Sequence, residues 1–127
     1  MIKKTIQLFL FIMGMIFSAS CKKTVYIAPV VPDTVSFSKH IIPMFNQYCN
    51  NPGCHSGYQP QGNLDLSPSA AYQQLISKSA IDTLHPSSSL LYSQMNSVNK
   101  PMPPSGKLDT FYLKEVLRWI EQGARNN

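Results

Sequence analysis

The fold of this chain depends on one stretch, Cys49-Asn50-Asn51-Pro52-Gly53-Cys54-His55, which holds two thiols and an imidazole within seven residues. The four residues between the cysteines have the composition of a tight turn. Asparagine tolerates left-handed backbone, Pro52 fixes its own φ, and Gly53 can adopt a positive φ. We therefore expect residues 50–53 to bulge and to return Cys54 close to Cys49.

A pair of cysteines with a histidine directly after the second is the pattern of c-type haem attachment. In such sites the two thiols form thioethers with the porphyrin vinyl groups, and the histidine ligates the iron. The usual spacing leaves about two residues between the cysteines, whereas this chain has four. Two alternatives stay open: a short-loop disulfide between Cys49 and Cys54, or a haem-free metal site formed by both cysteines, His55 and a distant fourth ligand.

Residues 1–20 are typical of a signal peptide, because a basic start is followed by an apolar run that is too short to span a bilayer comfortably. The small residues Ser18-Ala19-Ser20 then precede Cys21. This arrangement resembles a bacterial lipoprotein signal, in which cleavage occurs before the cysteine and the cysteine carries the lipid. The resemblance implies a lipidated Cys21 and a location at the bacterial cell envelope, facing the periplasm or the cell exterior. The alternative is an ordinary signal peptide with a free Cys21 thiol.

Charge and composition argue against several classes of function. Removal of Lys3 and Lys4 with the signal leaves a net charge of +3, without a dense cluster of basic residues, so nucleic-acid binding is not predicted. The acidic residues form no close pair, and the chain has no phosphate-binding glycine loop or nucleophilic triad. The chain is therefore predicted not to be an enzyme. Since so small a domain buries little surface by itself, a large apolar cofactor would complete its core.

The chain divides into a signal, a tether and one domain. Residues 21–35 contain two prolines and several β-branched residues, which favour an extended tether over the alternative of an edge strand. From Ser36, apolar residues recur at helical spacing and predict a short helix that ends near Cys49. Because proline is tolerated only in a first turn, Pro43 predicts that the regular helix begins near Ile42, after a looser turn.

Two further helices are predicted over residues 67–79 and 88–96, each preceded by serines that could cap it. In the second of these helices Leu90, Leu91 and Met95 are expected to face inward. Residues 99–106 contain three prolines and a glycine, so they are expected to be irregular.

The strongest helical signals lie at the end of the chain. Asp109 is a good N-cap, Leu108 and Leu113 can pack across it, and Gly123 can end the helix. One face carries the large apolar residues Tyr112, Val116, Trp119 and Ile120.

An aromatic helix that leads into Cys-x-x-x-x-Cys-His, a late Met-Pro-Pro loop and a closing amphipathic helix together resemble a small class I cytochrome c. The resemblance covers residues 36–127 and implies an all-α, cytochrome c-like domain wrapped around one covalent haem c. It makes Cys49 and Cys54 the attachment sites, His55 the proximal ligand and Met102 the distal ligand. In this family the first and last helices pack across each other, which here would bring Phe45 near Trp119 or Tyr112.

Met102 is flanked by Pro101 and Pro103, so its loop is stiff and can hold a thioether with little entropy left to lose. Met44, Met95 and His85 are the other candidates for the distal position. The two methionines are expected to pack in the core, and the histidine is expected in a polar loop.

The resulting expectation is an electron carrier that is tethered to a membrane and exchanges electrons with redox partner proteins. The alternative is a haem-free lipoprotein, with a Cys49–Cys54 disulfide, that acts as a binding or structural module. A third possibility is a haem sensor or peroxidase with an open sixth position.

Overall fold

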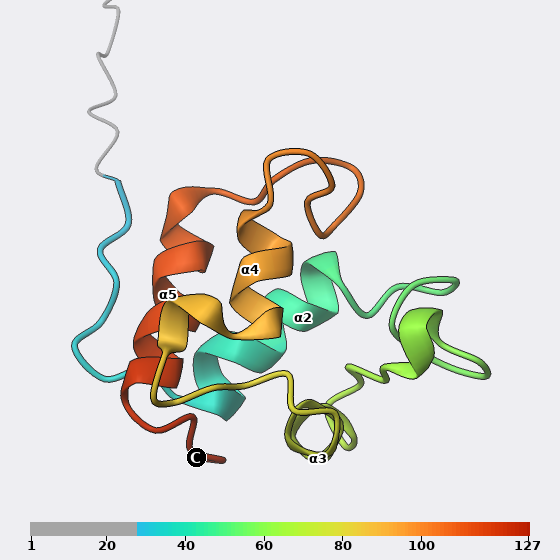
Figure 1. Cartoon of the computed structure of the whole chain (residues 1–127), viewed down its shortest axis with the longest axis horizontal. Helices are drawn as coiled ribbons and strands as arrows, with labels where there is room; N and C mark the ends of the chain where they lie inside the picture. The colour runs from blue at the N-terminus through green and yellow to red at the C-terminus, as the bar shows by residue number, and fades with distance from the viewer. Residues whose placement is uncertain (1–27) are drawn as a thin grey trace, which may run out of the picture.

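The computed structural model describes residues 28–127, so the predicted signal peptide, the lipidation site Cys21 and the start of the tether lie outside the described residues. Within residues 28–127 every regular element is helical and no strand occurs, which confirms the all-α prediction for this part of the chain (Figure 1). The elements are η1 (Phe37–Ile41), α2 (Ile42–Tyr48), η2 (Gln61–Asn63), α3 (Ala71–Ser77), η3 (Pro86–Ser88), α4 (Leu90–Asn96) and α5 (Thr110–Glu121). No described helix has the length and apolar character needed to cross a membrane.

The first helical segment has the predicted break. A wide π-helical turn, η1, leads directly into the regular helix α2, which begins at Ile42 and has Pro43 in its first turn. Proline fits there because the N–H groups of a first turn have no helical acceptor. Ser36 caps the segment, and its hydroxyl accepts a hydrogen bond from the Lys39 N–H at 3.3 Å.

The closing helix α5 also begins and ends as predicted. The Asp109 carboxylate accepts the Phe111 N–H at 2.8 Å, and Gly123 follows the helix with a φ of 89°. Its buried apolar residues are Leu113, Val116, Trp119 and Ile120. Glu115 is buried on the same helix, and the loss of hydration there raises the pKa of its carboxyl group.

The first and last helical segments pack against each other through aromatic rings, as the resemblance implied. The centroids of Phe37 and Trp119 lie 5.0 Å apart, and those of Tyr48 and Tyr112 lie 5.1 Å apart. Phe45 is fully buried, but its ring pairs with Phe37, at 6.4 Å. Phe37, on η1, therefore links Phe45 of α2 to Trp119 of α5.

The two middle helices, α3 and α4, are shorter than expected, and neither has a side-chain cap. Ser89 precedes α4, but its buried hydroxyl bonds the backbone N–H and carbonyl of Asp82, at 2.8 and 3.1 Å. The prediction that serine side chains cap these helices is therefore wrong. Met95 faces inward as predicted, whereas Leu90 is 51% exposed.

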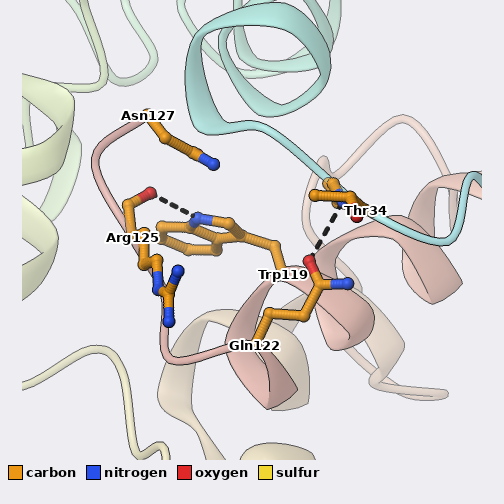
Figure 2. Close-up of a pocket in the computed structure, with 6 residues that line it drawn as sticks. Thr34, Trp119, Gln122, Arg125 and Asn127 are labelled. Carbon is orange, nitrogen blue, oxygen red and sulfur yellow. Dashed lines mark hydrogen bonds between the residues drawn. The ribbon is translucent and has the colours of Figure 1, made fainter.

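Residues 35–37 and the C-terminal segment are held together beside Trp119, where they help to line a pocket (Figure 2). The Trp119 indole N–H donates to the Arg125 carbonyl at 2.9 Å, and the Gln122 side-chain oxygen accepts the Val35 N–H at 3.0 Å. The Asn127 side-chain oxygen accepts the Phe37 N–H at 2.9 Å. These bonds secure the end of the tether and the C-terminal segment on the outer side of α5.

We predict that Phe37→Ala lowers the free energy of unfolding by about 3–5 kcal/mol, because it removes a buried ring that contacts Phe45, Tyr72 and Trp119. Urea unfolding followed by circular dichroism measures the change. The matched control is Tyr58→Ala, since that ring is 94% exposed and its loss should change stability by less than about 0.5 kcal/mol. Equal effects of the two substitutions would contradict the role given to Phe37.

Candidate functional site

The loop between the two cysteines forms the predicted tight turn. The Cys54 N–H donates to the Asn51 carbonyl at 2.9 Å, and Gly53 has a φ of 81°. Proline in the second position and a positive φ in the third are features of a type II turn. The His55 N–H then donates to the Cys49 carbonyl at 3.1 Å, which closes the loop. The residues between the cysteines therefore bulge outward, as expected from their composition.

Cys49 is placed by α2, because it is the residue directly after the last turn of that helix. Both Cys49 and Cys54 are half-buried free thiols. Burial, with a smaller contribution from the neighbouring Cys54, raises the pKa of Cys49 to about 11. Cys49 is therefore a protonated thiol at neutral pH.

The His55 ring is held by backbone carbonyls from the following loop. Its Nδ1 atom lies 3.0 Å from the Gln61 carbonyl oxygen and 3.3 Å from that of Leu64. Because a carbonyl only accepts hydrogen bonds, Nδ1 carries a proton, and in the neutral imidazole Nε2 then keeps its lone pair. The nearer of these two carbonyls belongs to Gln61, in the loop that follows His55. This tautomer is the one required of a histidine that ligates a metal through Nε2.

The cysteine and histidine side chains face two adjoining cavities of about 330 and 280 Å³. Four residues line both of them, namely Cys49, His55, Gln61 and Met102. The larger cavity is walled mainly by aliphatic side chains, which include Leu64, Leu66, Leu75, Leu90, Leu91 and Met95. The smaller one is lined by Tyr48, Gly53, Cys54, Pro103 and Pro104. Together they form a hollow with mainly apolar walls, in which Cys49 lines both cavities and Cys54 lines the smaller one.

Met102 reaches this hollow from the irregular loop 99–106. Its backbone N–H donates to the Gln94 carbonyl at 3.0 Å, which ties the loop to the end of α4. Its side chain is 38% exposed. The sulfur-bearing side chain of Met102 therefore lies at a cavity wall and is also open to solvent.

The other candidates for the distal ligand are Met95, Met44 and His85, and they differ in their burial and in their position relative to the hollow. Met95 lines the larger cavity and is buried, whereas Met44 is buried in the core and lines neither cavity. His85 is exposed, and its Nδ1 lies 3.2 Å from the Asp82 carboxylate. Of these three residues, only Met95 shares a cavity with His55.

The residues around the hollow fit a covalently attached haem. They offer two thiols, an imidazole with a free Nε2 and apolar walls, and these are the groups that such a cofactor requires. A haem-free metal site would instead need several close ligands. Residues 28–127 contain no group of three or more His, Cys, Asp or Glu side chains that could hold a metal ion.

Comparison of the chain with known protein families, with curated proteins and with solved structures gives no match.

Several cavity residues were missed by the sequence analysis. Gln61 contributes a backbone carbonyl to His55. Because any residue type could supply that carbonyl, the sequence gives no signal for it. Leu66, Leu75 and Lys78 come from segments that meet the cysteine loop only in the folded chain.

We predict that Cys49 in the haem-free protein reacts slowly with iodoacetamide. A thiol with a pKa of about 11 has roughly 100-fold less thiolate at pH 8 than a thiol at the usual value of about 9. The rate is measured by mass spectrometry of the tryptic peptide 40–78. A Cys54→Ser variant is used, so that this peptide contains Cys49 as its one cysteine. Since burial is the larger cause of the shift, the midpoint of the pH profile should stay well above 9 in this variant. The urea-unfolded variant is the control, and equal rates for its folded and unfolded forms would contradict the burial of Cys49.

Proposed function

We propose that this chain is a small class I c-type cytochrome, a one-electron carrier with one haem c. Cys49 and Cys54 attach the haem, while His55 and Met102 ligate its iron. We also propose that Cys21 carries a lipid, so that the domain is tethered at a bacterial envelope membrane, facing the periplasm or the cell exterior.

The observation that carries the proposal is the convergence of Cys49, His55 and Met102 on one apolar hollow, with the His55 Nδ1–H directed at a carbonyl. A disulfide staple would need the two cysteines alone. It would require neither a free Nε2 nor aliphatic walls of this extent. The environment of the thiols thus favours haem attachment over the haem-free alternative.

The bound haem would supply the ferric–ferrous couple. Cys49 and Cys54 would hold the group through thioether bonds. His55 presents Nε2, and its hydrogen bond to Gln61 fixes the ring and strengthens it as a ligand. Met102 offers a neutral sulfur, which favours the ferrous state. With His55 and Met102 both serving as ligands, electron transfer would be favoured over oxygen or peroxide chemistry.

A redox partner would dock where the hollow meets solvent. Leu90 and Met102 are apolar cavity residues that are also exposed, at 51% and 38%. Transient redox complexes commonly bury less than about 1,200 Å² in total. A small apolar rim of this kind suits a short-lived contact better than a permanent interface.

The first test is covalent attachment. When the chain is produced together with a haem-attachment system, we expect a sharp Soret band and haem that resists acid-acetone extraction, because thioether bonds survive it. Mass spectrometry should find the porphyrin on the peptide that contains residues 49–55. Replacing both Cys49 and Cys54 with alanine should abolish the resistant haem, and the matched control Cys21→Ser should retain it.

Colourless protein with an intact Cys49–Cys54 disulfide would overturn this proposal in favour of a haem-free binding or structural module. If the reduced haem protein bound carbon monoxide without displacing Met102, an open sixth position would be indicated. The chain would then be a sensor or a peroxidase.

The second test concerns the distal ligand. Met102→Ala should remove the near-infrared band of methionine-ligated ferric haem and lower the reduction potential, because a neutral sulfur ligand raises that potential. Met95→Leu is the matched control, since it removes a sulfur from the same cavity with little change in volume. Loss of the band in Met95→Leu but not in Met102→Ala would reverse the assignment.

A further inference from the structure

One charged side chain borders the hollow. Among the described residues that line its two cavities, Lys78 is the only lysine, arginine, aspartate or glutamate. It caps the C-terminal end of α3 and is exposed. In the described part of the chain, no carboxylate lies within salt-bridge distance of its ammonium group. Lys78 therefore has a free cation at the edge of an otherwise uncharged wall.

The position of Lys78 relative to the cysteines matters because a haem has two unlike edges. The vinyl groups that react with cysteines lie on one edge, and the two carboxylate-bearing side chains lie on the opposite edge. Cys54 lines only the smaller cavity and Cys49 lines both, whereas Lys78 lines only the larger one. A haem attached at Cys54 in the smaller cavity and extending into the larger one would carry its carboxylates into the cavity that Lys78 borders.

We propose that Lys78 pairs with a carboxylate of the haem and thereby raises the reduction potential of the iron. This inference rests on the proposed function. Near the iron a cation disfavours the more positive ferric state, and it also neutralises the charge of the carboxylate. A positively charged side chain is compatible with its position at the end of α3, where the helix dipole is negative.

The test compares reduction potentials of the haem-loaded protein. Lys78→Gln should shift the ferric–ferrous equilibrium toward ferric about two- to fivefold, the range for an exposed ion pair. This corresponds to a fall of roughly 20–40 mV, at ~59 mV per tenfold for one electron. The shift should shrink as salt is added, because the pair is open to solvent. Lys78→Arg should keep the potential of the unmodified protein.

Lys39→Gln is the matched control, because Lys39 is an exposed lysine in the last turn of η1 and lines neither cavity. It removes the same charge and should leave the potential unchanged. Equal potentials for Lys78→Gln and Lys39→Gln, with haem attached and the near-infrared band intact in both, would overturn the pairing and leave the proposed function standing. Absence of covalent haem from the unmodified protein would overturn both.

Discussion

The closure of the cysteine loop is the constraint on which the rest of the site depends. The turn over residues 51–54 absorbs the extra length between the thiols, and the His55 N–H bond to the Cys49 carbonyl returns the chain to the end of α2. Since η1 and α2 contact α5 through Phe37 and Tyr48, the loop is attached to a well-packed part of residues 28–127. The cysteines thus have a rigid support, although the loop itself lies at the surface.

The domain is packed unevenly around this loop. On the side of α5, apolar residues such as Trp119 and Ile120 are fully buried, and the C-terminal segment is bonded to Trp119 and to the start of η1 beside them. Around the hollow, in contrast, Leu90 and Met102 stay partly in water. Because apolar surface is stabilised by removal from water, a bound apolar group would gain most on this side. Under the proposed function, loss of haem therefore weakens the fold where α3, α4 and the 99–106 loop meet.

The predictable features were those determined by neighbouring residues. Asp109 and Gly123 set the limits of α5, and Pro43 set the start of α2, because capping and the missing proline N–H act within one helical turn. The partners of Ser89 and His55 follow from tertiary structure. The Ser89 hydroxyl bonds the Asp82 backbone and does not cap a helix. The carbonyl that fixes His55 is a backbone group, which any residue type could supply. The thiols and the imidazole could thus be identified from the sequence, but the walls of the hollow could not.

The loop that carries Met102 needs stiffness of its own, because the helices give it little support. Its backbone joins α4 through the Met102 N–H and the Gln94 carbonyl, and the Met102 side chain is open to solvent. A flexible loop in that position would lose much conformational entropy on holding a sulfur at one point. Prolines before and after Met102 restrict the loop in the unfolded chain as well, so less entropy is lost on folding. Under the proposed function, the Met-Pro-Pro sequence would support a weak neutral ligand, which an ordinary surface loop does not need to do.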